Sequence, residues 1–270
     1  MRAVSTWSLH RTLGRFVAPQ SAADGGTLMN GPSSTGGLAL LDLPRELAKR
    51  DYNTLHICHF HLPSRSAEYV AQLRDALSEA EIELDALLID DGDLTDPATA
   101  DQIEAWVGGW LDVAVALGAK RARVMAGRAD PTPESIRDYA QRLVRLANAH
   151  PDVRIVIENW SGLLSDAKSV TGVLREASES VGLLIDLGNW SGPDKYDELA
   201  CIAPFAETCH AKCHYHGGTL DVEDYQRTLH VLKDAGYSGP MVLIYDGADD
   251  DEWAQLDIEH ELTLSVFGSG

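Results

Sequence analysis

Short apolar runs alternate with amphipathic stretches along the whole chain. The apolar runs that predict buried strands cover about residues 3–9, 54–60, 82–89, 122–126, 153–158, 181–186, 207–213 and 241–245. Helical patterns cover about 43–50, 67–80, 96–118, 132–150, 166–177, 197–203, 222–235 and 251–266. Strands that alternate with helices indicate βαβ units and a parallel sheet. Eight of each within 270 residues predict one (β/α)8 TIM barrel over residues 1–270.

Capping residues support these helix limits. Asp96 followed by Pro97 predicts a helix start, and Gly118 predicts the end of the same helix. Thr132 followed by Pro133 predicts the start of the next helix by the same chemistry.

One segment interrupts the alternation. Residues 19–37 are rich in Gly, Ser, Asp and Pro and have no hydrophobic period. This pattern predicts a loop insertion after the first strand, on the face of the barrel where active sites lie. A lid over the site and a disordered insertion are both consistent with this composition.

Charge and composition narrow the classes of function. The formal net charge is −20, which repels nucleic acid and anionic membranes, so we expect neither as a partner. The sequence contains no apolar run long enough to span a bilayer and no apolar signal-peptide core at its start. The four cysteines have no CxxC spacing, which favours a reducing cytoplasm over a disulfide framework. The oligomeric state stays open, a homo-oligomer included.

Two successive predicted strands end on an ionisable residue, Glu158 and Asp186, and the run 206–210 in the next strand stops on His210. Burying such groups is costly unless they have a partner. The carboxyl ends of parallel barrel strands meet at one mouth, so a shared divalent metal ion would supply that partner. The pattern therefore predicts a metal centre at the C-terminal end of the barrel.

Several short motifs lie at matching places on these strands. They are Ile157-Glu158-Asn159, Ile185-Asp186-Leu187-Gly188-Asn189, His210-Ala211-Lys212, Gly236-Tyr237-Ser238-Gly239-Pro240 and His59-Phe60-His61-Leu62-Pro63. With them, nearly the whole chain resembles the xylose-isomerase-like sugar phosphate isomerase/epimerase family. The resemblance implies a TIM barrel with one divalent ion (Mn, Mg, Co or Zn), held by Glu, Asp, His and Glu from strands five to eight. The first three ligands carry over to Glu158, Asp186 and His210.

The fourth ligand does not carry over. The resemblance places a Glu at the position of Ile244. Asp246 lies two residues further and shares its face of the strand, so either Asp246 or water would complete the coordination. A second departure is His56, where relatives commonly carry an acid. From its parity on the strand we expect His56 to pack between sheet and helices.

Further residues around the predicted mouth are candidates for substrate contact, each with a structural alternative. Lys212 would hold a substrate oxygen or form a salt bridge with Asp186 or Glu158. His61 is a candidate substrate contact or acid/base, and its alternation with His59 would allow both to face the mouth. The remaining candidates would line a sugar pocket or serve as core and loop residues: Trp7, Trp160, Asn189, Trp190 and His214. Arg123 would pair with an anionic substrate or, by default, at the surface.

The resemblance implies a metal-dependent isomerase, epimerase or lyase that acts on a sugar or keto-sugar through an enediolate-type intermediate. Glu158 would serve as ligand and base. Because Ile244 removes the second acid/base Glu, a non-catalytic barrel that binds sugars or metabolites is the alternative. DNA repair, which related AP endonucleases perform, is disfavoured by the charge and by the small number of ligands.

Overall fold

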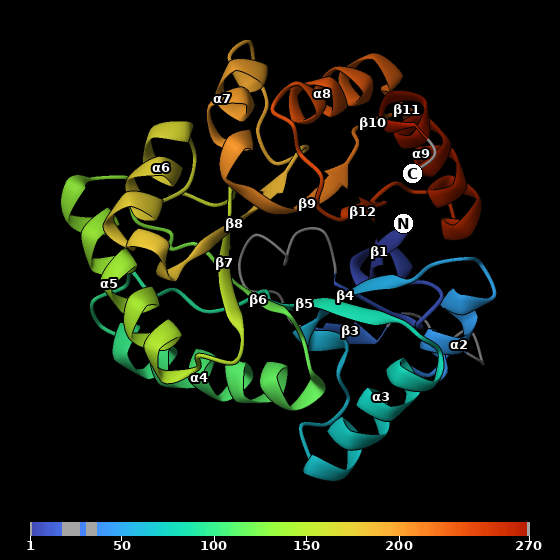
Figure 1. Ribbon diagram of the computed structural model, residues 1–270, viewed down its shortest axis with the longest axis horizontal. Helices are drawn as coiled ribbons and strands as arrows, with labels where there is room; N and C mark the ends of the chain where they lie inside the picture. The colour runs from blue at the N-terminus through green and yellow to red at the C-terminus, as the bar shows by residue number, and fades with distance from the viewer. Residues whose placement is uncertain (1, 18–27, 31–36, 269–270) are drawn as a thin grey trace.

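The computed structural model describes residues 2–17, 28–30 and 37–268. Eight parallel strands form a closed barrel, and eight helices surround it (Figure 1). The predicted TIM barrel is therefore confirmed. The barrel strands are β1 (Ala3–Ser5), β4 (Thr54–Cys58), β5 (Glu83–Ile89), β6 (Arg121–Val124), β7 (Arg154–Glu158), β8 (Gly182–Asp186), β9 (Ala206–Lys212) and β12 (Met241–Ile244).

The helices follow the strands in the expected alternation. They are α2 (Leu43–Ala48), α3 (Ala67–Glu79), α4 (Ala100–Leu117), α5 (Pro133–Ala149), α6 (Ala167–Glu176), α7 (Lys195–Ile202), α8 (Val222–Asp234) and α9 (Glu252–Phe267). Among residues 2–17, 28–30 and 37–268, no helix combines the length and apolar character that a membrane crossing requires.

The capping predictions meet different outcomes. Gly118 ends α4 in the left-handed conformation at φ 77°, and Thr132 forms a capping box at the start of α5, as predicted. The predicted start of α4 at Asp96 is wrong. The Asp96 side chain accepts a hydrogen bond from the Ala98 amide instead, which closes a separate turn before the helix begins at Ala100.

The first and second barrel strands are shorter than their apolar runs. β1 is followed by the 3-10 helix η1 (Thr6–Leu9) and β4 by η2 (His59–His61). The Ser5 hydroxyl accepts a hydrogen bond from the Trp7 amide at 3.2 Å, which starts the first of these turns. Strand parity therefore cannot be extended beyond Ser5 or Cys58.

The predicted insertion at about 19–37 falls mostly on residues outside those described. Within it, β3 (Leu28–Asn30) pairs antiparallel with β2 (Arg15–Val17). The choice between a lid and a disordered insertion concerns residues 18–27 and 31–36, which also lie outside the described part of the chain.

Two irregularities in strand register place carboxylates in the barrel. Between β4 and β5 the pairing passes from Leu55–Leu84 to His56–Ala86, so that Asp85 is an extra residue. A bulge of this kind redirects a side chain that regular alternation would place elsewhere. Glu207 is the corresponding extra residue of β9 opposite β8.

Apolar residues pack in two regions. A large cluster fills the space between the barrel and its helices. Two small clusters occupy alternate strand positions, and Trp7 packs against both of them. Their residues are Cys58, Ala86, Leu88, Val156 and Leu184 in one, and Ala3, Val242 and Ile244 in the other. These small clusters form the apolar part of the barrel interior below the mouth.

Candidate metal centre

Three side chains at or near the ends of barrel strands converge at the C-terminal end of the barrel. Glu158 ends β7, Asp186 ends β8 and His210 lies on β9, and these strands are neighbours in the sheet. One ligand atom from each residue lies within 4.8 Å of the others, and all three residues are buried. Over the described ranges, no other His, Cys, Asp or Glu belongs to this group. We refer to these three residues as the Glu158–Asp186–His210 cluster.

The cluster is held together by charge. The Nδ1 atom of His210 lies 3.1 Å from Oε1 of Glu158 and 3.6 Å from Oδ2 of Asp186. Burial disfavours the imidazolium, but the two carboxylates outweigh burial and raise the pKa of His210. The Asp186 side chain also accepts a hydrogen bond from the Gly188 amide at 2.7 Å, which fixes its orientation. The two carboxylates therefore stabilise a positive charge placed between them, here that of protonated His210.

Arg123 on β6 contributes a buried cation beside the cluster. Only 3% of its side chain is exposed, it pairs with Asp90, and its Nε lies 3.2 Å from Oε2 of Glu158. Burial favours the neutral acid, but Arg123 and His210 outweigh it and hold the pKa of Glu158 well below its usual range. The default of a surface ion pair for Arg123 is therefore wrong, because Asp90 and Glu158 together draw its guanidinium into the barrel.

The donor set fits a divalent cation. Two carboxylates and one imidazole leave coordination positions for water or substrate, which is the pattern of catalytic metal sites. Asp90 offsets the charge of Arg123. Glu158 and Asp186 then retain two negative charges, which the proton on His210 reduces. A divalent ion in place of that proton would neutralise the cluster.

Lys212 and Asp246 form a separate pair at the mouth. Nζ of Lys212 lies 2.8 Å from Oδ2 of Asp246, so its partner is neither Asp186 nor Glu158. Burial lowers the pKa of Lys212 less than Asp246 and Asp186 raise it, and the side chain stays cationic. Asp246 lies outside the Glu158–Asp186–His210 cluster. Its role as a fourth ligand stays a prediction.

A comparison with protein families identifies the relatives of this barrel. Residues 44–262 match the family model described as xylose isomerase-like TIM barrel. The chain belongs to the xylose isomerase-like TIM barrel family. No curated protein matches its sequence. Family membership agrees with the sequence motifs around the cluster.

Solved structures share the fold of this family member at low sequence identity. D-psicose 3-epimerase from Clostridium cellulolyticum H10, solved with D-tagatose, is 14% identical with a TM-score of 0.68, over 86% of this chain and 95% of that chain. A xylose isomerase-like TIM barrel protein from Mycobacterium smegmatis, in complex with magnesium, is 15% identical with a TM-score of 0.64, over 97% of each chain. The probable 3-DHS dehydratase AsbF from Bacillus anthracis is 12% identical with a TM-score of 0.65, over 98% of each chain.

The position where the family resemblance places a Glu is apolar and faces the barrel interior. Ile244 is 3% exposed and packs with Ala3 and Val242. In the sheet it lies opposite Lys212 of β9. The barrel wall beside the mouth therefore carries an apolar side chain where the family resemblance places a carboxylate.

His56 contradicts its sequence prediction. It does not pack between sheet and helices: its Nδ1 lies 3.1 Å from Nε2 of His210, and its Nε2 lies 2.8 Å from Oδ2 of Asp85. The prediction failed because β4 ends at Cys58, so the parity of His59 and His61 does not apply to His56. Burial lowers the pKa of His56 more than Asp85 raises it.

The histidines of η2 point in different directions. His61 lies beside the mouth, where its Nδ1 is 2.8 Å from Oγ1 of Thr6 and its Nε2 is 3.3 Å from Nδ1 of His10. His59 instead packs edge-on against Trp106 and Trp110 of α4. The expectation that both residues face the mouth is wrong for His59, because the chain leaves the strand before it.

The three predicted tryptophans differ in how deeply they are buried. Trp7 is half-buried beside His10, and Trp160 is half-buried with the Arg123 guanidinium 5.6 Å from its ring centre. Trp190 is buried, and its Nε1 donates to the Leu164 carbonyl at 3.2 Å, which is the core-filling alternative.

Two polar candidates, Asn189 and His214, form hydrogen bonds at the mouth. Asn189 donates to Oε1 of Glu158 at 3.1 Å, and Nε2 of His214 lies 2.8 Å from the Gly188 carbonyl. Both contacts support the loop that follows β8.

Sequence reasoning missed three residues that support the site: Asp85, Asp90 and His10. A charged residue inside the apolar run of residues 82–89 was a signal for Asp85. Asp90 directly follows that run and was equally visible. His10 had no such signal, since its place beside His61 depends on the turn after β1.

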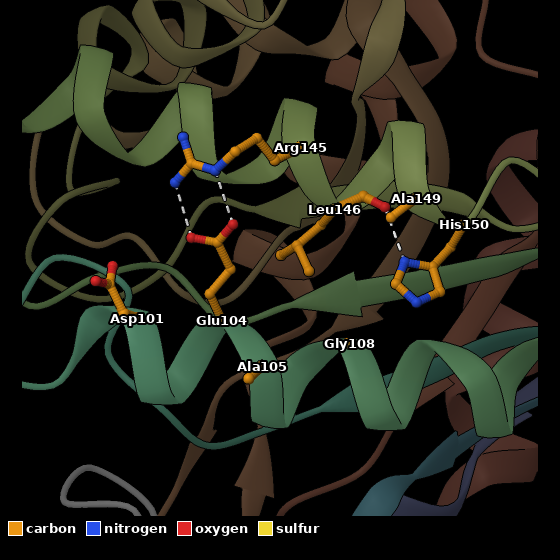
Figure 2. Close-up of a pocket in the computed structure, with 8 residues that line it drawn as sticks. All are labelled: Asp101, Glu104, Ala105, Gly108, Arg145, Leu146, Ala149 and His150. Atoms are coloured by element: carbon orange, nitrogen blue, oxygen red, sulfur yellow. Dashed lines mark hydrogen bonds and ion pairs between the residues drawn. The ribbon is translucent and has the colours of Figure 1, made fainter.

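A pocket on the outer surface lies between α4 and α5, away from the barrel mouth (Figure 2). Its polar groups already pair with one another: Arg145 binds both carboxylate oxygens of Glu104, at 2.9 and 2.8 Å. His150 bonds the Leu146 carbonyl at 2.9 Å. None of the predicted site residues lines this pocket, so the barrel mouth remains the candidate site.

Proposed function

We propose that this protein is a metal-dependent isomerase, epimerase or lyase that acts on a sugar or keto-sugar through an enediolate-type intermediate. The observation that carries the proposal is the buried Glu158–Asp186–His210 cluster at the ends of three adjacent strands. Two low-identity structural neighbours, an epimerase solved with D-tagatose and a probable dehydratase, are consistent with either an isomerase or a lyase.

Glu158, Asp186 and His210 would hold the divalent ion, which is Mn, Mg, Co or Zn in this proposal. When bound, such an ion polarises a substrate carbonyl or hydroxyl and makes the adjacent C–H more acidic. Glu158 is ionised; its Oε1 accepts from Asn189 and lies 3.1 Å from Nδ1 of His210, while its Oε2 faces Arg123. Its lowered pKa makes it a better ligand than base.

The other mouth residues then divide the remaining tasks. Lys212 stays protonated beside Asp246, and its ammonium group would stabilise negative charge on a substrate oxygen. His61 has two ring nitrogens bonded to Thr6 and His10, a pairing through which a proton can move. We assign the proton transfer at substrate carbon to His61, for which the substrate would replace His10 as the partner of Nε2. Trp7 and Trp160 would stack on the apolar face of a sugar.

A specific observation supports a second candidate, a non-catalytic sugar- or metabolite-binding barrel. Ile244 closes the barrel wall where the family resemblance places an acid/base Glu. A barrel without that group would keep the pocket and lose a proton-transfer step. Substrate turnover separates this candidate from the enzyme.

The test is a screen of keto-sugars and sugar acids with metal-free protein, with and without added Mn²⁺. The proposal expects turnover that depends on Mn²⁺ and is lost in Glu158→Gln. Glu104→Gln on the outer surface is the matched control, since it also removes a carboxylate paired with an arginine. Binding of a sugar without turnover would support the non-catalytic barrel instead.

A further inference from the structure

His210 forms hydrogen bonds through both ring nitrogens, and the two directions differ in chemistry. Its Nδ1 faces Glu158 and Asp186, where a metal would bind. Its Nε2 faces Nδ1 of His56 at 3.1 Å, deeper in the barrel. Only one of these nitrogens can offer an electron pair to a metal while the other keeps its proton. The partner of Nε2 therefore decides which nitrogen binds metal.

The hydrogen bonds form a chain from Asp85 through His56 to His210, and the groups around Asp85 fix which atom donates in each of them. Arg121 donates to Oδ1 of Asp85, and Thr208 donates to Oδ2 at 2.9 Å. Asp85 is ionised: burial raises its pKa, but the hydrogen bonds from His56 and Thr208 and the charge of Arg121 outweigh burial and lower the pKa to about 2. An ionised carboxylate only accepts hydrogen bonds. The Nε2 atom of His56, 2.8 Å from Oδ2 of Asp85, must therefore carry a proton.

His56 is completely buried, and Arg121 already balances the charge of Asp85. The nearby carboxylate of Glu207 is shared by Arg121 and Arg154, so it does not compensate a second positive charge on His56, and the neutral ring is favoured. With its proton on Nε2, neutral His56 offers the electron pair of Nδ1. Nε2 of His210 then donates to it, and Nδ1 of His210 is the nitrogen that can bind metal.

We propose that Asp85 and His56 are positioning residues that keep the proton of His210 on Nε2 and direct its Nδ1 electron pair toward the metal position between Glu158 and Asp186. This inference rests on the proposed metal binding. It gives a purpose to the extra residue Asp85 in β5, whose bulge brings a carboxylate to His56.

Asp85→Asn tests the direction of the chain at nearly constant shape. The carbonyl of the new amide is needed by Arg121, so its NH₂ group faces Nε2 of His56. That reverses the chain and moves the proton of His210 to Nδ1. Thr208→Val is the matched control, because it removes a hydrogen bond to the same Asp85 oxygen and leaves the direction unchanged. In serine proteases, replacing the buried Asp that bonds the catalytic His by Asn has the same effect, because the His then adopts the wrong tautomer.

A second pair of variants removes and restores the acceptor. His56→Leu places a carbon atom where the ring has Nδ1. The Asn side chain of His56→Asn is close to Leu in shape but places an amide oxygen at that point. Both lose the bond to Asp85, so a difference between them reports on the acceptor alone. This pair carries the test if Asp85→Asn does not fold.

Metal binding is measured by titrating each metal-free variant with Mn²⁺, after its folding has been checked by thermal unfolding without metal. We expect Asp85→Asn and His56→Leu to bind about 10- to 100-fold more weakly, and Thr208→Val and His56→Asn to stay within about threefold of wild type. Nitrogen NMR of the zinc-loaded wild type should show a proton on Nε2 of His210 and none on Nδ1.

Two failures can be told apart. If wild type binds Mn²⁺ and folded Asp85→Asn binds it as tightly as Thr208→Val, the positioning role is overturned and the metal centre stands. If wild type binds no metal, the proposed function fails and this inference falls with it.

Discussion

Ile244→Glu should restore the carboxylate that the family resemblance places on the last strand. Ile244 is 3% exposed, faces the barrel interior and lies opposite Lys212 in the sheet. A Glu side chain from this position adds an oxygen ligand beside the Glu158–Asp186–His210 cluster. We expect tighter metal binding and a less stable metal-free protein.

The magnitude follows from the charges already present. Without metal, a third carboxylate joins Glu158 and Asp186, and Arg123 is already shared with Asp90. Two like charges about 5 Å apart repel by about 3 kcal/mol at an effective dielectric constant of about 20. The free energy of unfolding of the metal-free variant should fall by that order. With metal, a gain of about 1.4 kcal/mol corresponds to tenfold tighter binding, which is the smallest gain we expect.

Urea unfolding with and without Mn²⁺, together with calorimetric titration, measures both quantities. Ile244→Gln is the matched control, since it loses the same packing and adds no charge. The metal-induced gain in unfolding free energy should be larger for Ile244→Glu than for the control. If folded Ile244→Glu binds Mn²⁺ no tighter than Ile244→Gln, then position 244 does not adjoin a metal centre, and our account of the missing ligand is wrong.

Three further predictions concern Glu259, a buried residue of α9 that accepts hydrogen bonds from Cys213 and Tyr215, and the mouth residues Gly188 and Asp246. Burial raises the pKa of Glu259 to about 7, so its contribution to stability is complete below the unfolded pKa near 4.5 and is lost as pH rises through 7. Between pH 4.5 and 8 the free energy of unfolding of wild type should therefore fall by on the order of 3 kcal/mol from this group, and Glu259→Gln should not show that fall. Gly188→Ala places a methyl group 2.7 Å from Cγ of Lys212, so it should displace that side chain and lower activity, with no added effect in Lys212→Met. Asp246→Asn should keep Mn²⁺ affinity and move the alkaline limb of the pH–rate profile to lower pH, because Asp246 helps raise the pKa of Lys212; weaker Mn²⁺ binding would instead make Asp246 the fourth ligand.

The strand-end residues of the site were predictable because they depend on topology alone. Once β7, β8 and β9 are neighbours in a parallel barrel, their terminal side chains must meet at its mouth. The apolar runs that end at Glu158 and Asp186 therefore placed the cluster without knowledge of packing. Ile244 was identified differently, from the family resemblance, and its contacts with Ala3 and Val242 place it on the barrel interior.

What failed depended on local geometry that hydrophobic period does not encode. The bulge at Asp85 and the turn that follows Cys58 decide where His56 and His59 point, and neither feature changes the apolar pattern. The burial of Arg123 depends on a partner 33 residues earlier in the chain, Asp90. Such pairs become apparent only when the strands are assembled.

The central claim is that Glu158, Asp186 and His210 bind one divalent ion. Elemental analysis of protein dialysed against Mn²⁺ tests it most directly, for wild type and for the double variant Glu158→Gln, Asp186→Asn, which keeps shape and removes both charges. We predict one ion per chain in wild type and none in the folded double variant. Equal metal content in the two proteins would contradict the account.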